Sequence, residues 1–473
     1  DSPETLAKLP VLSLDEFRQD RLGKKPGQTE KHETSKGVNY YATLDDSAGT
    51  DEANMYFELP ASGGDLKYAA LMTRFLNCRF SSLGLNNVYC SLSPAENFFD
   101  ENDINPRFII SVSYGKTAIA ETALQVVEFL NRKDLFSAKE LTNFLEHESN
   151  NSKALSSIPY FIAYDMMAAS QAQADKFRTA TLGSSGAGSI FYYSFIKQLL
   201  QAPSEYNACA SRLNTLFANT INRNGLIVSY YGDNTGYNTF KSIFEPFAAN
   251  MAWKVRTTYA DTLQTTLQPD YNSAVILSDK QDVSHILQVG SINKSGYRYS
   301  GKMEVLGNLL TSKYLTPVLR GKMGAYGASA SFTNGKIIFS VAGMSGIDKA
   351  LEVFEGAGNY LRSLSITQKE LDSIIISTVN QFDQYYNSDN YRFEQKPLAG
   401  CTIDDWKKIR QDMLNTTVDD IKNYAGFVDA AIAQKSVFAV ANGETAAKTE
   451  FPFECAVNSA DFRVTPLVNK TSG

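Results

Sequence analysis

The chain repeats part of its own sequence at an offset of about 230 positions. The run RFIISVSYGKTAIAETALQVVEFLN, which begins at Arg107, resembles KIIFSVAGMSGIDKALEVFEGAGNYLRS, which begins at Lys336. Within these runs Ser111 matches Ser340, an offset of 340 − 111 = 229. A repeated block of this length indicates that one structural unit occurs twice, which constrains the fold more than any single motif.

Two further pairs of blocks keep nearly the same offset. SAKEL and TQKEL share Lys-Glu-Leu at residues 139–141 and 369–371, an offset of 369 − 139 = 230. YFELP begins at Tyr56 and ILQVG at Ile286, also 286 − 56 = 230, and each is followed by a turn and a helix ending LMTRFL or LLTSKYL. We therefore expect two copies of one fold in the 473-residue chain.

The pattern inside each copy predicts an α+β fold. Both β-rich runs are bounded by turn residues, and Asn334-Gly335 is a strong hairpin signal. After each run, apolar residues recur at helical spacing: Ala120, Leu124, Val127 and Leu130 in one copy, and Leu351, Phe354 and Leu361 in the other. We predict two homologous domains, each a mainly antiparallel sheet with helices packed on one face.

The domain boundaries follow from the repeat. Residues 1–37 lie outside both copies, are rich in charge, Gly and Pro, and are weakly periodic, as is typical of a linker or docking arm. We expect a first α+β domain at 38–270 and a second at 271–473.

Composition excludes several classes of partner. A net charge of −6 is unfavourable for binding phosphate backbones, so we expect no nucleic-acid partner. No apolar run approaches the roughly 20 residues needed to cross a bilayer, and DSPETLAKLP at the start lacks the basic and apolar regions of a signal peptide. The expectation is a soluble chain with no membrane partner, in a compartment that the sequence leaves unknown.

Catalytic and metal-binding motifs are missing. Neither HExxH nor HxxEH occurs, and the three histidines are read as ordinary side chains, so we expect this chain to bind no metal: His32, His147 and His285. The five cysteines form no CxxC pair and are expected to be buried apolar residues. No GxSxG elbow is present either.

Two glycine- or acid-rich stretches have structural explanations. GSSGAGS at 183–189 lacks GK[ST], so we expect a turn in which Ser189 caps the next helix. TVDD at Thr417–Asp420 resembles a capping box that opens a helix ending near Gly426.

One stretch, LRGKMGAYG at Leu319–Gly327, offers candidate functional residues. The preceding helix is expected to end near Arg320, and the small residues after Tyr326 suit close approach of a second backbone, either a packed helix or a bound peptide. Arg320 at a helix end can interact with the helix dipole, and Tyr326 can be a half-buried strand tyrosine. Physical reasoning leaves these structural interpretations and a binding role equally open.

LLTSKYLTPVLRGKMGAYGASASFTNGKIIFSVAG resembles the C-terminal half of pitrilysin or insulinase-type zinc metalloproteases, closest to the presequence protease and falcilysin branch. The opening DSPETLAKLPVLSLDEF is similar to the family's linker, and the resemblance is strongest from Leu309 to Val341. It implies four homologous α+β domains in a two-part clamshell, with the HxxEH zinc site in the other half.

The resemblance also implies roles for residues of this chain. Arg320 would bind the substrate backbone and Tyr326 would stabilise the tetrahedral intermediate, with Gly324 and Gly327 in the same substrate-binding loop. The implied function is the substrate-binding half of a zinc endopeptidase that degrades unfolded or short peptides. Its zinc would be held by an N-terminal HxxEH half or subunit, without which this chain would be inactive. The alternative is a noncatalytic scaffold subunit of an insulinase-like assembly.

Overall fold

The structure, a computed structural model, describes residues 13–19, 27–115, 118–186, 188–253, 271–280, 282–333, 335–386, 398 and 400–467. The chain divides into two compact units, and each is described by itself. Unit 1 contains Asp1–Gly23, Val283–Lys396 and Cys401–Lys435, and unit 2 contains Lys24–Asp282, Pro397–Gly400 and Ser436–Gly473. The boundaries predicted at residues 38 and 271 stay a prediction.

Unit 2 is built on a six-stranded sheet with the order β1-β2-β8-β3-β7-β4. The strands are β1 (Thr29–Ser35), β2 (Val38–Leu44), β3 (Thr50–Glu58), β4 (Val88–Ser93), β7 (Arg107–Gly115) and β8 (Ile227–Gly232). β2 and β8 are parallel, and the other neighbouring pairs are antiparallel. The predicted α+β class with a mainly antiparallel sheet is confirmed.

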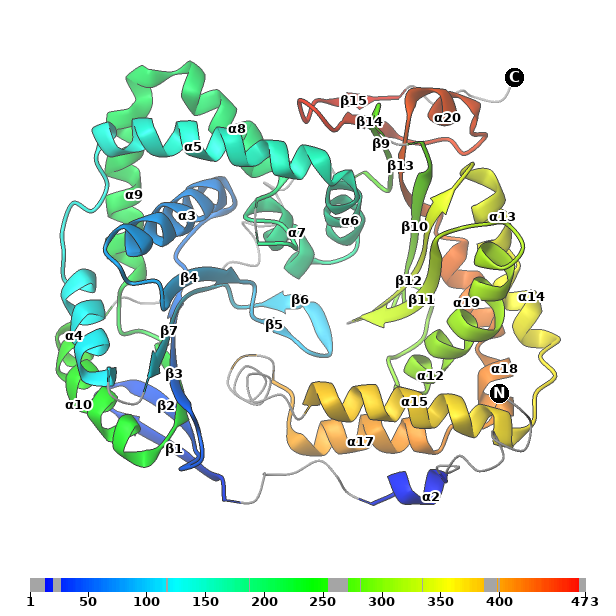
Figure 1. Cartoon of the computed structure of the whole chain (residues 1–473), viewed down its shortest axis with the longest axis horizontal. Helices are drawn as coiled ribbons and strands as arrows, with labels where there is room; N and C mark the ends of the chain where they lie inside the picture. The colour runs from blue at the N-terminus through cyan, green and yellow to red at the C-terminus, as the bar shows by residue number, and fades with distance from the viewer. Residues whose placement is uncertain are drawn as a thin grey trace. The chain divides into compact units, whose positions relative to one another are not determined.

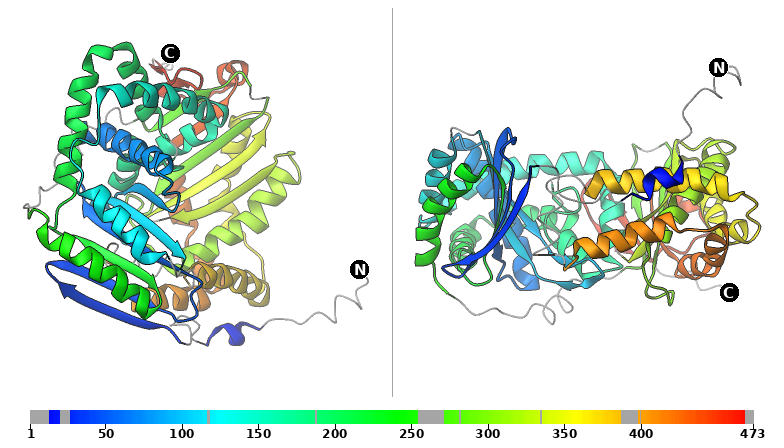
Figure 2. Two further views of the ribbon diagram at one scale, coloured as in Figure 1. Left: turned by 60° about the vertical axis from the view of Figure 1, so that its left-hand side comes forward. Right: turned by 90° about the horizontal axis from the view of Figure 1, so that it is seen from below.

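Helices cover one face of this sheet. The helices that contact its strands are α3 (Leu66–Ser82), α4 (Ile119–Leu130) and α10 (Asn234–Asn250). Figure 1 shows them on the same side of the strands, and α4 and α10 lie next to each other in Figure 2. The alternate residues Ala53, Met55 and Phe57 of β3 are fully buried, as period-2 side-chain alternation requires for a face packed on helices. Tyr56, which belongs to the opposite face, packs with Ile109 and Ile227.

More helices of unit 2 surround this sheet and its helix layer: α5 (Ala138–Ser157), α6 (Pro159–Ala169), α7 (Gln173–Ala180), α8 (Ile190–Gln201) and α9 (Tyr206–Thr220). Unit 2 also contains four strands from the second half of the chain: β9 (Ser273–Leu277), β13 (Ser436–Ala441), β14 (Cys455–Asn458) and β15 (Val464–Pro466). β9 lies between β13 and β14 and is parallel to both.

Unit 1 contains three antiparallel strands with β12 in the middle: β10 (Ser284–Ser291), β11 (Gly327–Thr333) and β12 (Lys336–Met344). The predicted Asn334-Gly335 turn falls between the last two strands in the sequence, and Asn334 lies outside the described residues. The helices are α12 (Gly301–Leu309), η3 (Leu310–Arg320), α13 (Asp348–Glu355), α14 (Ala357–Arg362), α15 (Gln368–Tyr386), α17 (Ile403–Leu414), α18 (Val418–Asn423) and α19 (Ala425–Ile432).

The predicted repeat has a counterpart in strand topology. β7, which contains Ser111, is flanked by antiparallel β3 and β4, and β12, which contains Ser340, is flanked by antiparallel β10 and β11. In both cases the middle strand comes last in the chain. The blocks around the two serines are therefore topologically equivalent strands.

The strand pairing shifts one of the predicted block alignments. Ser111 lies opposite Asn54, whereas Ser340 lies opposite Leu287, which aligns these strands at 287 − 54 = 233. The sequence match of Tyr56 with Ile286 gave 230, three residues away. Residues 55–57 are consecutive buried apolar side chains, and a run without alternation carries little information about register.

Both sheets protect an edge strand with a helix side chain. In unit 2 the Asn77 amide of α3 accepts from the Cys90 N–H at 2.6 Å and donates to the Cys90 carbonyl at 2.9 Å. In unit 1 the Thr311 hydroxyl of η3 accepts from the Ala330 N–H at 2.8 Å and donates to its carbonyl at 3.1 Å. Because an unpaired strand edge invites pairing with another chain, each contact blocks strand addition at that residue.

The predicted arm is partly ordered structure. Helix α2 (Leu14–Phe17) belongs to unit 1, where Phe17 is buried and Arg18 donates to the Asn415 side chain at 3.2 Å. Thr29–Ser35, assigned to the arm by the sequence analysis, form β1 and pair with β2. This edge strand was not predicted, because charged residues on both of its faces remove the apolar alternation by which strands are identified in a sequence.

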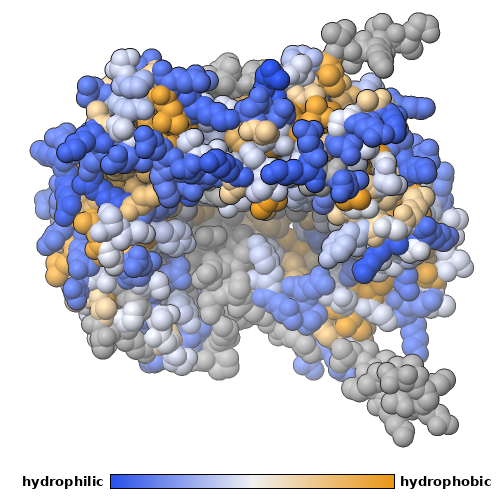
Figure 3. All heavy atoms as spheres, turned by 45° about the horizontal axis from the view of Figure 1, so that its top comes forward, coloured by the Kyte–Doolittle hydropathy of each residue, from blue (hydrophilic) through white to orange (hydrophobic). Residues whose placement is uncertain are grey.

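The face drawn in Figure 3 is mostly polar where its residues are coloured. Hydrophilic residues cover most of the face drawn in Figure 3, and apolar residues occur there in small separate groups. None of the helices in the described ranges has the length and apolar character needed to span a bilayer.

Candidate functional site

The helix before the candidate loop has a widened final part that ends at Arg320. In η3 the N–H of Gly321 reaches the carbonyl of Thr316, and that of Met323 reaches Val318, both five residues back, so the turns are π-helical. Pro317 lies inside this segment. A proline in an α-helix removes one hydrogen bond and clashes with the carbonyl four residues earlier, and the wider π turn changes that spacing.

The loop after η3 closes on buried residues and leaves its neighbours exposed. The Ala325 N–H donates to the Leu319 carbonyl at 2.9 Å, and both side chains are buried. Arg320 and Tyr326, each one position further along the chain, are exposed, and Tyr326 keeps 86% of its surface accessible. The structure thus brings the two predicted residues to the two ends of one closed loop.

The backbone of Tyr326 is fixed by the sheet. Its N–H donates to the Ala342 carbonyl of β12 at 2.8 Å. Gly343, the next residue of β12, has φ +82°, and a Cβ there would lie 2.9 Å from both the Cβ and the nitrogen of Tyr326. A glycine is therefore needed beside Tyr326. Gly343 was not predicted, because its only signal in the sequence is a glycine inside a β-rich run.

Of the two predicted loop glycines, Gly324 has a backbone conformation that favours glycine and Gly327 does not. Gly324 has φ +78°, a left-handed conformation that other residues adopt rarely, whereas Gly327 opens β11 with no neighbour within 4 Å of an added Cβ. Gly324 thus shapes the loop, and Gly327 leaves open space beside Tyr326.

The polar ends of Arg320 and Tyr326 have no partner among the described residues. No hydrogen bond, ion pair or ring contact of either side chain occurs in the part of the chain that the structure describes. The observed exposure of Tyr326 differs from the half-buried strand tyrosine of the structural interpretation. A free guanidinium offers planar donors to a carbonyl or carboxylate, and a free phenol can donate to a developing oxyanion.

The small residues of β11 are explained by a packed helix on one face. A Cβ on Gly307 of α12 would lie 3.1 Å from the Ala330 carbonyl, so helix and strand approach closely. The Thr311 contact to the same residue lies beside it. On the other face the Ser329 and Ser340 hydroxyls are 2.8 Å apart. Of the two open explanations, helix packing therefore accounts for Ala330.

Helix η3 is also held from its outer side. The Tyr314 hydroxyl donates to the Val353 carbonyl of α13 at 2.8 Å, and its ring stacks on Tyr360 of α14 with centroids 4.7 Å apart. A Cβ on Gly356 would lie 2.5 Å from the Tyr314 hydroxyl oxygen. These contacts fix the helix that carries Arg320 without involving its side chain.

No metal centre is found in the described ranges, because no three His, Cys, Asp or Glu side chains gather there in a way that could hold an ion. His32 stacks on Tyr41 at 4.2 Å, His147 is exposed on α5, and burial lowers the pKa of His285. Four cysteines are buried as expected, but Cys78 is exposed, because it lies on the outer side of α3.

The GSSGAGS loop has the predicted capping role. The Ser189 hydroxyl accepts from the Tyr192 N–H at 3.1 Å at the start of α8. The Asp165 carboxylate accepts from the Ser184 N–H at 2.8 Å, and burial raises the pKa of Asp165 to about 6. This acidic group of α6, held against the loop, opposes a phosphate there.

The second capping motif is confirmed at its start and wrong at its end. Thr417 and Asp420 form the capping box of α18. That helix ends at Asn423, and Gly426 belongs to the separate helix α19, which begins at Ala425. The chain therefore bends before the predicted stop.

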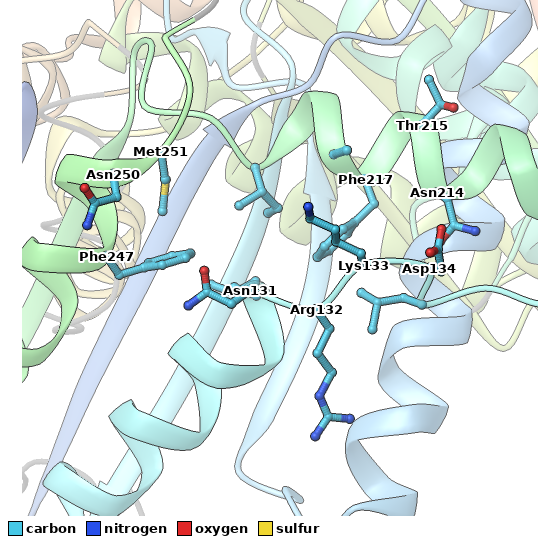
Figure 4. A pocket seen from close by; sticks show the side chains of 14 residues that line it. Asn131, Arg132, Lys133, Asp134, Asn214, Thr215, Phe217, Phe247, Asn250 and Met251 are labelled. Atoms are coloured by element: carbon cyan, nitrogen blue, oxygen red, sulfur yellow. The ribbon is translucent and has the colours of Figure 1, made fainter.

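A pocket of about 510 Å³ lies in unit 2, away from the candidate loop in sequence (Figure 4). Its lining comes from the C-terminal ends of α4, α9 and α10 and the segment 131–135. Asn214 is already engaged, since its amide pairs with both the N–H and the carbonyl of Phe136. Arg320 and Tyr326 are not among its lining residues.

Comparisons with known proteins find a family model and relatives that agree with each other. The family described as "PreP C-terminal domain" matches residues 274–443. Presequence protease 1, chloroplastic/mitochondrial, of Arabidopsis thaliana is 25% identical over 271 residues, which are 54% of this chain and 24% of that protein. The matched part of the chain thus spans about a quarter of that relative's length.

Solved structures of low identity share the fold. The first half of the periplasmic protease PqqL from Escherichia coli has a TM-score of 0.60 and 13% identity, covering 90% of this chain and 94% of that chain. Pitrilysin has a TM-score of 0.56 and 10% identity, covering 89% of this chain and 44% of that chain. The predicted resemblance is confirmed by these matches.

Proposed function

We propose that this chain, which resembles the C-terminal half of a pitrilysin or insulinase-type metalloprotease in sequence and fold, is the substrate-binding half of a two-part zinc endopeptidase. Its substrates are unfolded or short peptides. Its partner is an N-terminal half or subunit that carries HxxEH and holds the zinc.

The single observation that carries the proposal is the pair at the two ends of the closed loop. Arg320 and Tyr326 are exposed and have no partner among the described residues, yet their backbones are fixed by Leu319, Ala325 and Ala342. Side-chain donors that stand on a fixed backbone and have no partner among the described residues are available to bind a peptide backbone or an oxyanion.

Each residue has a distinct part in the proposed reaction. The zinc of the partner half would activate water for attack on the scissile carbonyl. Arg320 donates to a carbonyl of the bound peptide, which holds its backbone in place. Tyr326 donates a hydrogen bond from its phenol hydroxyl to the oxygen on which negative charge develops, without itself acting as the base.

Reconstitution tests the proposal directly. Cleavage of a fluorogenic unfolded peptide is measured with this chain alone, with an HxxEH half alone and with the two mixed. We expect activity only on mixing, and its loss when zinc is removed by a chelator. Tight association without cleavage would instead support a noncatalytic scaffold subunit, and cleavage by this chain alone would contradict the proposal.

A further inference from the structure

The sheet of unit 2 contains an insertion that the equivalent strands of unit 1 lack. Between β4 and β7 the chain has 106 − 94 + 1 = 13 residues, whereas β11 and β12 are joined by the two residues 334–335. The longer connection forms a hairpin of β5 (Glu96–Asn97) and β6 (Asp100–Ile104). Since a two-residue turn suffices to join the equivalent strands, the hairpin is not needed for the sheet.

The tip of this hairpin exposes an aromatic side chain. Phe98 and Phe99 occupy the turn, with their rings T-shaped at 5.0 Å. Phe99 is 52% exposed, and its N–H donates to the Asn97 side chain at 2.9 Å, which fixes the turn. In Figure 1 the hairpin projects beyond the sheet on the side away from α4 and α10. Single exposed apolar side chains are common on protein surfaces, so Phe99 has to be considered together with the charged residues beside it.

The base of the hairpin is anchored within unit 2. Arg178 of α7 forms ion pairs with Glu96 of β5 and with Asp175, and the Gln173 N–H donates to the Asn102 side chain at 3.2 Å. The ion pair of Glu96 with Arg178 connects β5 to helix α7, and it does not involve the residues at the tip of the hairpin. The anchors thus keep the hairpin ordered while its tip remains open.

The charge of the hairpin defines its partner. Residues 94–106 contain four acidic residues and no Lys or Arg. Asp100 and Asp103 are exposed, and among the described residues neither has a basic partner; they accept only from the Asn102 N–H and the Asn97 amide. An exposed ring followed in the chain by carboxylates without a basic partner is complementary to an apolar side chain that has cations next to it.

We propose that the β5–β6 hairpin is a second peptide contact, in which Phe99 packs on an apolar side chain of an extended segment and Asp100 and Asp103 bind its flanking Lys or Arg. The inference rests on the proposed function, because it takes the peptide substrate as the ligand. It adds a specificity-determining site outside the Arg320 and Tyr326 loop.

Binding to the full chain tests the hairpin without any catalysis. The probe is a fluorescein-labelled 12-residue peptide with a central Leu between two Arg. Its Kd for the chain is measured by fluorescence anisotropy at low and at high salt. We expect Phe99→Ser to raise Kd about tenfold at both salt concentrations, the scale for losing one buried apolar contact. Asp100→Asn with Asp103→Asn should raise Kd severalfold at low salt only, because salt screens exposed charges.

Matched variants separate the hairpin from general effects. Leu124→Ser removes an equally exposed apolar side chain (49%), and Glu352→Gln with Glu355→Gln removes two exposed carboxylates elsewhere; both should leave Kd unchanged. Phe99→Leu should restore binding. Equal Kd values for the hairpin variants and the controls, or no saturable binding of the probe by the wild-type chain, would overturn the inference.

The same variants distinguish this inference from the proposed function. If the mixture with an HxxEH half never cleaves peptide while the hairpin variants still weaken probe binding, the proposed function fails and the hairpin contact stands. If the mixture is active and the hairpin variants bind the probe as the wild type does, the hairpin contact fails alone.

Discussion

The Ala325 N–H donates to the carbonyl oxygen of Leu319 at 2.9 Å, and this bond joins the end of η3 to the start of β11. Both side chains face inward, so the next residue in each case, Arg320 and Tyr326, lies outside the core. The positions of these two residues therefore depend on buried neighbours, while their side chains do not contribute to packing. Function and stability can be separated by mutation here.

Tyr326→Phe should abolish most of the activity of a reconstituted enzyme while leaving stability unchanged. The side chain is 86% exposed and its hydroxyl has no described partner, so its loss removes no folding contact. Loss of one oxyanion donor is expected to lower kcat by roughly 10²-fold. Steady-state kinetics and thermal melting check the two parts. The control is Tyr314→Phe, whose hydroxyl bonds Val353 and which should lower stability by about 1 kcal/mol with little effect on kcat.

Arg320→Ala should weaken peptide binding by a reconstituted enzyme. A contact to a backbone carbonyl acts in both the ground state and the transition state, so KM rises and kcat/KM falls. Lys322→Ala removes another exposed cation from the same loop and should change neither parameter by more than about twofold. Equal effects of the two variants would mean that only the loop's charge matters.

Gly343→Ala should disturb the candidate loop through Tyr326. Its φ of +82° disfavours alanine, and the new Cβ would meet the Tyr326 backbone at 2.9 Å. The expected loss is about 1–3 kcal/mol in the free energy of unfolding, together with reduced activity. Gly346→Ala, where an added Cβ has no neighbour within 4 Å, is the matched control and should be close to neutral. Urea unfolding of both variants decides the point.

Asp165→Asn should change how stability depends on pH. Burial raises the pKa of Asp165 from its ordinary value of 3.8 to about 6, and nearby Asp175 adds to the shift. Because the pKa is higher in the folded chain, the contribution of this carboxyl is fully present below about pH 4 and is lost as the pH rises through 6. The loss amounts to about 3 kcal/mol for a shift of about two units.

Asparagine at position 165 is neutral at every pH and should remove this dependence. The variant should therefore gain up to about 3 kcal/mol relative to wild type between pH 4 and pH 8, measured by urea unfolding. Asp279→Asn, at an exposed position, should give a curve parallel to wild type. If the stability of Asp165→Asn also followed the wild-type dependence on pH, the raised pKa of Asp165 would be contradicted.

Thr311→Val should weaken the protected edge of β11. The variant keeps the shape of the side chain but leaves the Ala330 N–H and carbonyl without their partner. Unmade hydrogen bonds at a partly buried edge should cost about 1–3 kcal/mol. Ser312→Ala, which removes an exposed hydroxyl bonded only to the Asn308 carbonyl, should cost less than about 0.5 kcal/mol. Concentration-dependent association of Thr311→Val alone, seen by size-exclusion chromatography, would confirm that the edge had been opened.

The fold class was predictable because the repeat and its apolar periodicity survive in the sequence. Ser111 and Ser340 could be matched by eye, and their strands have equivalent neighbours. The charged strand Thr29–Ser35 was not recognised, because an edge strand can carry polar residues on both faces. The predicted alignment of β3 with β10 was three residues off for a similar reason, because residues 55–57 do not alternate between apolar and polar side chains.

The candidate site was predictable only in part. The family resemblance singled out Arg320 and Tyr326, and their roles remain predictions. Gly343 could not be found, because the collision that excludes a side chain there involves Tyr326, which is distant in sequence and lies just before the neighbouring strand β11. The β5–β6 hairpin was missed because its two strands are short and acidic, and strand signals depend on runs of apolar and β-branched residues.

The placement of β9 between β13 and β14 has a consequence for synthesis on the ribosome. β9 ends at Leu277, but its first partner begins at Ser436, 436 − 277 = 159 residues later. At about 5–20 residues per second, the nascent strand waits on the order of ten seconds or more with both edges unpaired. Ala274 and Ile276 are fully buried in the finished sheet, so an apolar strand must stay shielded throughout this interval. Co-translational chaperone binding should therefore be concentrated on the segment that includes β9.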